Sequence, residues 1–547
     1  MNKELMDTFK EDLKDFREMT GKFYAGEVSV KDYKGFSGGF GSYAQKGGAA
    51  SMLRLRMPGG RITLEKLKFL ADSIEKYHVK RAHLTTCQTV QFHDLDADAV
   101  CDIMEQAMEV GIVTRGGGGD FPRNTMVSPL SGVERGEYFD VLPYAECVSD
   151  YLMGIIKTVK LPRKLKVGFS NSPANVTHAT FRDLGFVAKE NGTFDVYSAG
   201  GLGNNYRMGV KVAENVKPEE VLYYVEAMVR TFTTYGNYES RAKSRTRYMQ
   251  ETLGIEGYKT AYQEKLEEVQ QEFGSNLLIK AVQIDGQIKD AKSKETEMKA
   301  FSAASRETKE ETQENKYETV STYPQSQSAE QRVIAQKQNG LYAVAYHPVG
   351  GMISPQKFGE LYEILQEVPE AELRIAPEET LYIINLPEQY LENVLAATAD
   401  GARNLFETSV SCIGSTVCQI GLRDSQGLLE SIRKAVEPYH FADGVLPRIH
   451  ISGCTSSCGT HQIGKLGFHG ASRRVDGKMQ PAFALHVNGQ DAQGGEHFGE
   501  EWGVMLASDI PAFFVELGMN ISAENTTYDI WYKKNSEKLK EIVKKRL

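Results

Sequence analysis

Residues 52–95 read MLRLRMPGGRITLEKLKFLADSIEKYHVKRAHLTTCQTVQFHDL, and residues 343–386 read AVAYHPVGGMISPQKFGELYEILQEVPEAELRIAPEETLYIINL. The two stretches align without a gap at a constant offset of 291 positions, so that Gly59-Gly60 falls on Gly350-Gly351. The apolar positions that follow keep this register, with Leu84, Val90 and Phe92 falling on Ile375, Leu381 and Ile383. A register that holds over 44 positions indicates that the chain arose by gene duplication.

Each copy predicts the same unit: an alternating strand, a Gly-Gly turn, a helix and a second alternating strand. The helix is expected to open at Thr63 in the first copy and at Ser354 in the second, because both are favourable N-cap residues. The duplication therefore predicts two α+β halves that pack about a pseudo-twofold axis. Ligands often bind at the seam between such halves, so we expect the functional site there.

The chain is long enough for several structural units, with 547 residues against ~100–200 for one domain. Hydrophobic residues make up 41% and charged residues 25%, a profile that excludes a wholly disordered chain, a collagen and a coiled-coil rod. The net charge of −9 argues against a dedicated binder of nucleic acid or anionic membranes. The sequence has neither a run of ~18 apolar residues nor a secretory signal. We therefore expect a cytoplasmic protein with no nucleic-acid or membrane partner.

Four of the seven cysteines form two pairs in the second half of the chain. Cys412 and Cys418 give a C-x5-C motif, and Cys454 and Cys458 give a C-x3-C motif. Four thiolates suit either a [4Fe–4S] cluster or a tetrahedral zinc ion. Zinc sites favour the tighter C-x2-C spacing, whereas wider spacings suit a bulkier cluster. The motifs therefore predict a metal centre, with the iron–sulfur cluster favoured over zinc.

The cysteine pattern, with GCTSSCG at residues 453–459, resembles that of the sirohaem-dependent sulfite and nitrite reductases. Members of that family are duplicated proteins whose sirohaem lies between the halves, next to a [4Fe–4S] cluster. The resemblance implies that Cys412, Cys418, Cys454 and Cys458 are the cluster ligands and that Cys458 bridges the cluster to the sirohaem iron. It also implies an α+β fold in which each half has a small ferredoxin-like (parachute) unit and a larger mixed α/β catalytic unit.

The resemblance and the composition together predict six segments. Residues 263–338 are rich in Lys, Glu, Gln and Ser, which predicts a charged linker or insert between the halves. The expected segments are an N-terminal extension (1–45), the first ferredoxin-like half domain (46–125), the first sirohaem-binding α/β domain (126–262), this linker, the second ferredoxin-like half domain (339–400), and a [4Fe–4S]/sirohaem domain with a basic C-terminal tail (401–547).

Four basic residues of the first half match the positions at which the family binds its substrate anion: Arg54, Arg123, Lys164 and Lys166. Read alone, each is typical of a solvated surface. Lys164 and Lys166 are two positions apart, so on a strand they point to the same face, where two ammonium groups repel unless an anion or a carboxylate lies between them. The resemblance implies that the arginines hold the oxyanion and that the lysines both hold it and relay protons.

Further positions correspond to macrocycle contacts in the family: Gln91, His93, Arg163, and the glycines Gly200, Gly201 and Gly203 of the SAGGLGNN loop. Two positions depart from the family, because Cys87 and His83 stand where arginines usually bind sirohaem carboxylates. Either other cations bind these carboxylates or the macrocycle is held differently. Arg374, at the repeat position of His83, is one candidate replacement. Cys87 itself is expected to be a small buried residue.

The leading functional hypothesis is a sulfite reductase that performs the six-electron reduction of sulfite to sulfide. The family's nitrite reductases typically carry asparagine at the position of Lys166, so this lysine favours sulfite, and nitrite reduction to ammonia is the alternative. A second alternative is a non-catalytic iron–sulfur or zinc protein. The sequence shows no flavin or NADPH module, so ferredoxin or a separate flavoprotein is the expected electron donor.

Overall fold

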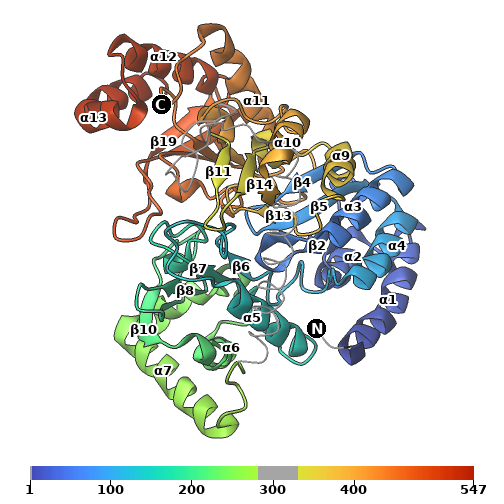
Figure 1. Ribbon diagram of the computed structural model, residues 1–547. Helices are drawn as coiled ribbons and strands as arrows, with labels where there is room; N and C mark the ends of the chain where they lie inside the picture. Colours follow the sequence, from blue (N-terminus) through green and yellow to red (C-terminus); the bar gives the residue numbers. More distant parts are fainter. Residues whose placement is uncertain (1–2, 281–330) are drawn as a thin grey trace.

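The computed structural model describes residues 3–280 and 331–547, in which helices surround four β-sheets (Figure 1). Two of these sheets are antiparallel, and two combine parallel with antiparallel pairs. Each half of the chain contributes one sheet of each kind. No helix of the described residues is long and apolar enough to cross a bilayer.

The first antiparallel sheet has the strand order β1-β2-β5-β4. Its strands are β1 (Ser42–Ala44), β2 (Ser51–Arg56), β4 (Arg81–Leu84) and β5 (Thr89–Leu95), and they pack with α3 (Leu64–Lys76) and α4 (Ala97–Ala107). As predicted, Thr63 caps the helix that follows the Gly-Gly turn, and its hydroxyl accepts from the backbone N–H of Lys66. Two further helices precede this sheet, α1 (Lys3–Tyr24) and α2 (Val30–Ser37).

The second antiparallel sheet has the order β11-β12-β14-β13-β3 and contains one strand from the other half. Its own strands are β11 (Val333–Ala335), β12 (Leu341–Tyr346), β13 (Glu372–Ile375) and β14 (Leu381–Pro387), accompanied by α9 (Gln356–Leu365) and α10 (Leu391–Ala397). The fifth strand, β3 (Arg61–Ile62), comes from the first half and pairs antiparallel with β13. The helix expected to open at Ser354 begins at Gln356, after Pro355.

The two antiparallel sheets share one hydrophobic core. Leu67 and Leu70 of α3 belong to the same buried cluster as Phe358 and Leu361 of α9. Phe16 of α1 is buried in this cluster too. The first (blue) and second (yellow) half domains accordingly lie side by side in Figure 1.

The backbone confirms the duplication at the predicted offset. The turn Pro58–Gly60 falls on the turn Val349–Gly351, and β4 falls on β13. The unusual backbone angles repeat as well. Gly59 and Gly350 have φ of 64° and 61°, while the non-glycine residues Gln88 and Glu379, which also coincide, have φ of 57° and 68°.

The two mixed sheets also share one topology. In the first half the order is β10-β9-β8-β7-β6, and in the second it is β19-β18-β17-β16-β15. The first sheet contains β6 (Met126–Val127), β7 (Val167–Ser170), β8 (Leu184–Ala188), β9 (Phe194–Ser198) and β10 (Val210–Val216), with α5 (Leu142–Gly154), α6 (Val221–Tyr235) and α7 (Met249–Phe273). The second contains β15 (Val410–Ser411), β16 (Ile449–Ser452), β17 (Leu466–Val475), β18 (Lys478–Val487) and β19 (Glu500–Leu506), with α11 (Ser425–Val436), α12 (Ile510–Ala523) and α13 (Tyr528–Lys544).

The middle strands of the two mixed sheets, β8 and β17, both begin with the sequence Leu-Gly-Phe, which aligns the two halves. In that register Ser172 and Val176 occupy the positions of Cys454 and Cys458. The first half therefore carries the same loop without its sulfur atoms.

Several elements cross the boundaries expected from the sequence. The segment assigned to a linker, 263–338, begins inside α7, whose Leu266 and Val269 are buried, and ends after β11. The remaining part of that expected linker, residues 281–330, lies outside the described residues. The first half domain begins at β1 rather than at residue 46. The basic tail is the helix α13, whose Trp531 and Leu539 are fully buried against the second mixed sheet unit. Charge-rich composition concealed these elements because only one face of each helix is apolar.

Candidate functional site

The four paired cysteines lie on two loops at one edge of the second mixed sheet. Cys412 directly follows β15, and Cys454 lies just beyond β16. Because β15 and β16 are parallel neighbours, their carboxyl ends meet at the same edge. There the thiol of Cys458 interacts electrostatically with those of Cys412, Cys418 and Cys454. Cys458 is therefore close enough to the other three thiols for their charges to interact, and the role of the four as cluster ligands stays a prediction.

The surroundings of Cys412 suit a sulfur ligand. Its Sγ accepts from the backbone N–H of Gly453 at 3.1 Å and lies 3.2 Å from the hydroxyl of Ser425. Burial raises the pKa of Cys412 to about 12, and the charge of Cys458 acts in the same direction. All seven cysteines are free thiols. Buried thiols of this kind need positive charge to ionise, and a bound [4Fe–4S] cluster or zinc ion supplies it.

The predicted substrate-binding cations come from three segments of the first half. Arg54 lies in β2, Arg123 shortly before β6, and Lys164 and Lys166 directly before β7. The guanidinium groups of Arg54 and Arg123 both donate to the carbonyl oxygen of Gly117, Arg123 at a distance of 2.7 Å. The two arginines are thus held side by side by one backbone carbonyl.

The glycine-rich loop RGGGGD, residues 115–120, positions these arginines, and the sequence analysis did not single it out. Besides Gly117, the carbonyl of Gly119 accepts from Arg123 at 2.7 Å. A Cβ on Gly117 would lie 2.8 Å from the carbonyl oxygen of Thr114, so a side chain there would displace the loop. The four consecutive glycines were the signal available in the sequence.

Lys164 and Lys166 lie among other cations. Burial lowers the pKa of Lys164 well below its usual value, and the charges of Arg245 and Lys166 lower it further. Burial likewise lowers the pKa of Lys166; the charge of Cys87 opposes this shift, and the charges of Arg182 and Arg245 add to it. Lysines with lowered pKa values release protons more readily near neutral pH, as the predicted proton relay requires.

Cys87 differs from the small buried residue that the sequence predicts. Its side chain is partly exposed and accepts a hydrogen bond from Lys166. Burial alone would raise the pKa of this thiol, but Lys166, Arg182 and Arg54 lower it to about 6. The thiolate form therefore predominates at neutral pH. Cys87 thus carries a negative charge where the family has an arginine, and it is paired with Lys166, a predicted substrate-binding residue.

Three more arginines, Arg182, Arg245 and Arg247, lie at this site. Arg245 pairs at 2.9 Å with Asp183, whose carboxylate also accepts from the backbone N–H of Lys166 at 2.9 Å. Burial opposes ionisation of Asp183, but Arg245 and hydrogen bonds lower its pKa below the usual value. In the sequence, Arg245 and Arg247 belong to the run SRAKSRTR, which is typical of a solvated surface, so pattern alone did not identify them.

The hydrogen-bonding capacity of these arginines is not fully used. Among the described side chains, Nε of Arg123, Nε of Arg245 and Nη1 of Arg247 are buried without a hydrogen-bond partner. Buried guanidinium groups in native proteins are normally satisfied, and carboxylates and oxyanions are their preferred partners. Sirohaem carries several carboxylates, so this donor set fits sirohaem together with an oxyanion substrate.

The predicted glycine loop lies between Arg247 and the cysteine loop of the other half. A Cβ on Gly203 would lie 3.5 Å from the carbonyl oxygen of Thr455, and Gly203 accepts from the side chain of Gln462 at 3.3 Å. A Cβ on Gly201 would lie 3.4 Å from Nη1 of Arg247. Gly200 packs against backbone, because its Cβ would lie 2.7 Å from Cα of Phe181. The loop therefore lies beside the cysteine loop, and its packing against the macrocycle stays a prediction.

Gln91 and His93 share the face of β5 that carries the cations. The strand register pairs Gln91 with Arg54 on one side and with His83 on the other. When the Gln91 amide oxygen faces Arg54, it accepts from Nε of that residue at 2.9 Å. Both Gln91 and His93 are buried, and of the two Gln91 contacts Arg54.

Two arginines considered for the macrocycle are already paired. Arg163 lies 2.6 Å from Asp120, which also pairs with Arg241. Arg374 lies 2.8 Å from Glu372 in the second half domain. The pair occupies only part of the Arg374 guanidinium, whose Nη1 is buried without a partner among the described side chains, so Arg374 as the replacement stays a prediction.

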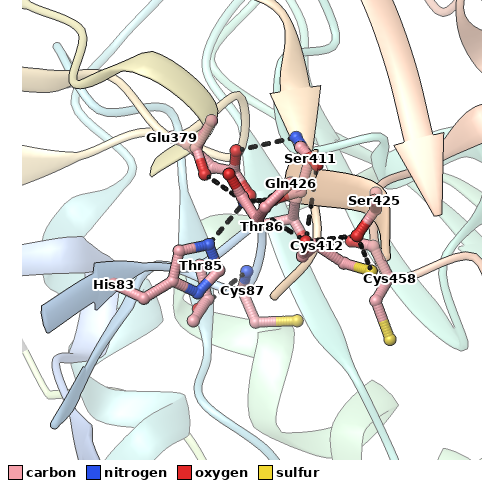
Figure 2. Close-up of polar contacts among 12 residues, drawn as sticks. His83, Thr85, Thr86, Cys87, Glu379, Ser411, Cys412, Ser425, Gln426 and Cys458 are labelled. Atoms are coloured by element: carbon pink, nitrogen blue, oxygen red, sulfur yellow. Dashed lines mark hydrogen bonds and ion pairs between the residues drawn. The ribbon is translucent and has the colours of Figure 1, made fainter. Parts of the chain in front are cut away.

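His83, the second departure from the family, lies in a buried polar group beside the cysteine loops (Figure 2). Its Nε2 is 3.7 Å from Oε1 of Glu379, whose other oxygen accepts from the backbone N–H of Ser411 at 3.1 Å. Burial lowers the pKa of His83 to about 4, so the imidazole is neutral. Nearby, Thr86 donates to the carbonyl of Cys458 at 2.8 Å and joins the two halves at the site.

Two family descriptions match the chain. "Nitrite and sulphite reductase 4Fe-4S domain" matches residues 118–270, and "Nitrite/Sulfite reductase ferredoxin-like half domain" matches residues 43–110 and 334–400. The second match falls on both copies of the repeat and confirms the duplicated half domains. The first match falls on the mixed-sheet unit of the first half, whereas the paired cysteines lie on the equivalent unit of the second half.

Several relatives resemble most of the chain. The ferredoxin–nitrite reductase of Synechococcus elongatus is 26% identical over 467 residues, which cover 81% of each protein. The chloroplastic ferredoxin–nitrite reductase of Arabidopsis thaliana is 24% identical, covering 84% of this chain and 74% of the relative. The sulfite reductase [ferredoxin] of Mycobacterium tuberculosis is 23% identical, covering 80% and 73%.

The structure of the Mycobacterium tuberculosis NirA protein matches this fold with a TM-score of 0.72, at 22% sequence identity and 92% coverage of both chains. That likeness confirms the predicted architecture. The two family descriptions together match more than half of the chain, and the paired cysteines and the buried cations fit the cofactors that the family uses. The protein therefore belongs to the nitrite and sulfite reductases, oxidoreductases that carry sirohaem and a [4Fe–4S] cluster.

Proposed function

We propose that this protein reduces sulfite to sulfide with electrons from ferredoxin or a similar one-electron carrier. One observation carries the proposal: Lys164, which faces Arg245 and Arg123 in the first half, also interacts with Cys458 of the second half. Cationic groups that bind an oxyanion therefore lie across the seam from the cysteine that the resemblance places next to the sirohaem iron. When bound, the sirohaem supplies the iron at which the substrate is reduced, and the cluster supplies electrons to it.

The residues of the chain have separate tasks in this proposal. Cys412, Cys418, Cys454 and Cys458 would hold the cluster. Arg182, Arg245 and Arg247 would bind sirohaem carboxylates, with the loop of Gly200, Gly201 and Gly203 against the macrocycle and Arg163, Gln91 and His93 around it. For Arg245 and Arg247 this assignment uses guanidinium N–H groups that are buried without a partner among the described side chains.

Arg54, Arg123, Lys164 and Lys166 would bind the substrate and supply protons. The guanidinium of Arg123 keeps its Nε free of partners among the described groups, and Arg54 is held beside it by the carbonyl of Gly117. Guanidinium groups can bind an oxyanion through two parallel hydrogen bonds. Sulfite loses three oxygen atoms as water, and each loss requires protons. The two lysines, with lowered pKa values, would deliver them.

Nitrite reduction to ammonia is the second candidate, and the relatives named ferredoxin–nitrite reductase favour it. The choice of sulfite rests on Lys166, where the family's nitrite reductases typically carry asparagine. Nitrite is planar with two oxygens, whereas sulfite is pyramidal, has three oxygens and carries more charge. A further cation in the pocket therefore benefits sulfite more than nitrite.

The deciding experiment compares the two substrates on one preparation. We expect the purified protein to show a Soret band with a far-red band and to contain about five iron atoms per chain, one from sirohaem and four from the cluster. With reduced methyl viologen as donor, kcat/KM for sulfite should exceed that for nitrite. A higher kcat/KM for nitrite would overturn the sulfite assignment, and a colourless zinc-containing protein would overturn the enzyme proposal altogether.

A further inference from the structure

Three histidines converge on the second mixed sheet, apart from the four cysteines. His461, His469 and His486 each offer a ring nitrogen, and these nitrogens all lie within 4.8 Å of one another. His461 and His486 are buried, while His469 is partly exposed. The proposed reduction of sulfite uses none of them.

Strand register brings two of the histidines together. His486 of β18 pairs with Gly467 of β17, and His469 lies two residues beyond Gly467 on the same face of the sheet. His461 precedes β17 in a short 3-10 segment, His461–Ile463. This segment passes directly over Gly467, where a Cβ would collide with the carbonyl oxygen of His461. The glycine thus allows the third imidazole to approach the other two.

The hydrogen bonds of the cluster leave it suited to a cation. Nδ1 of His461 is 2.9 Å from the hydroxyl of Ser452, and this contact fixes the orientation of the ring, as hydrogen bonds to ligating histidines do in metal sites. Nδ1 of His469 and Nε2 of His486 are 3.0 Å apart. Glu501, the cross-strand partner of His486, places a carboxylate oxygen 3.7 Å from Nε2 of that histidine. Three imidazoles and one carboxylate form a typical zinc ligand set.

The first half shows that the fold itself does not require these histidines. In the equivalent sheet, Gly185 pairs with Tyr197, and Tyr197 pairs with Lys211. A Cβ on Gly185 would collide with the carbonyl of Ala179, just as one on Gly467 would with that of His461. Aligned through these glycines, Ala179, Val187, Tyr197 and Lys211 stand in place of His461, His469, His486 and Glu501.

The imidazoles are also in the protonation state that a metal requires. Burial lowers the pKa of His461 well below its usual value, and the neighbouring histidines lower it further. Burial and the charge of His486 lower the pKa of His469. Burial also lowers the pKa of His486, although the charge of Glu501 opposes this shift. Neutral imidazole is the ligand form, so no proton has to be displaced at neutral pH.

We propose that His461, His469 and His486 bind a divalent transition-metal ion, zinc by preference, with Glu501 as the fourth ligand. Zinc–nitrogen bonds are about 2.0–2.1 Å long, so nitrogens within 4.8 Å of one another reach a common ion after small side-chain rotations. The ion would join β17 and β18 to the segment that begins three residues after Cys458. It would thereby hold the cysteine loop against the sheet.

Zinc binding can be measured on untagged holoenzyme that has been treated with a mild chelator. The iron content is determined before and after, so that binding at the cluster cysteines is excluded. We expect calorimetric titration to give one Zn²⁺ per chain and zinc to raise the melting temperature. His469→Gln and His486→Gln should each weaken zinc binding about 100-fold, and Glu501→Gln about tenfold. His497→Gln, at an exposed histidine outside the cluster, should leave it unchanged.

The outcomes separate the alternatives. If the wild-type holoenzyme binds no stoichiometric zinc, the proposal is wrong and the histidines form only a hydrogen-bonded cluster. Zinc binding that survives both histidine substitutions at unchanged iron content would also overturn it. Glu501 is half exposed, so its variant remains informative if a buried histidine variant fails to fold. None of these results depends on whether the enzyme prefers sulfite or nitrite.

Discussion

Lys166 is the residue on which the choice between sulfite and nitrite depends. Replacing it with asparagine removes one cation from the pocket and the hydrogen-bond donor to Cys87. We expect kcat/KM for sulfite to fall on the order of 100-fold and that for nitrite to fall much less. Parallel assays with reduced methyl viologen measure the ratio. Lys160→Asn, an exposed lysine of the same segment, is the control, and equal losses on both substrates would contradict the assignment.

Cys87 should tune the proton chemistry of Lys166. Its thiolate, with a pKa of about 6, raises the pKa of Lys166 through charge and a hydrogen bond. Cys87→Ser removes the negative charge, so the pKa of Lys166 should fall. The alkaline limb of the pH profile of kcat/KM for sulfite should then move to lower pH. Cys147→Ser, a thiol packed at a different core, should leave the limb in place. If the alkaline limb of the pH profile does not shift in the Cys87→Ser variant, the Cys87 thiolate has no role in catalysis.

For individual residues, the sequence predicted those that belong to a motif. It missed residues that are distant in the sequence and come close only in the fold. The cysteine spacing predicted Cys454 and Cys458 as metal ligands, because ligand type and spacing are local properties. Cys87, between β4 and β5, and Lys166, directly before β7, are far apart in the sequence, and no periodicity links them. Arg245 and Arg247 were missed because burial turned an apparently solvated charge run into part of the site.

Among the elements, the exchanged strand β3 connects the two halves most directly. Arg61 donates to Glu372 of β13 at 2.9 Å, and Arg374 pairs with the same carboxylate. Both arginines, against the effect of burial, lower the pKa of Glu372 to about 2. Glu372→Gln should destabilise the protein by about 3 kcal/mol at pH 7, because the buried Arg374 loses its counter-charge and Arg61 keeps only Glu146, 3.2 Å away.

Urea denaturation followed by far-UV circular dichroism measures this loss, with the exposed Glu392→Gln as control. Because the pKa of Glu372 is lowered on folding, its stabilising effect is present above pH 4.5 and is lost as the pH falls toward 2. The difference between wild type and variant should therefore narrow on acidification. If the difference in the free energy of unfolding does not change with pH, packing rather than the charge of Glu372 accounts for the loss of stability.

The repeat unit could be predicted from the sequence, whereas the pairing of β3 with β13 of the other half could not, because the two differ in strand length and in the sequence distance between partners. Strands β2, β5, β12 and β14 are six or seven residues long and rich in apolar residues, which a sequence pattern can reveal. Strand β3 has only two residues, Arg61–Ile62, and its partner is more than three hundred positions away. Likewise α7 was truncated in the prediction because its solvent face is as charged as the linker beyond it.

For the whole molecule, the shared core predicts that neither half folds alone. The cluster that contains Leu67 and Phe358 is built from both halves, and β13 would lose a neighbouring strand without β3. We expect residues 1–280 and 331–547, expressed separately, to be insoluble or non-cooperative in unfolding. Co-expressed from one plasmid, they should co-purify as a 1:1 complex with the Soret band of the intact enzyme.

Size-exclusion chromatography and the absorption spectrum test this expectation. A double substitution of Leu67 and Phe358 by aspartate is the matched control, because it disrupts the shared core without touching the cysteines or the cations. A soluble, monomeric single half with cooperative unfolding would contradict the shared-core account.

The exchange of β3 also affects how the protein is made. When Arg61 leaves the ribosome, Glu372 lies 311 residues further along the message. At about 5–20 residues per second, β3 waits roughly 15–60 s for its partner strand to be synthesised. During this time the apolar face of α3 has no α9 to cover it. Nascent chains of this protein should therefore engage holdase chaperones early in translation and release them only after β13 and β14 emerge.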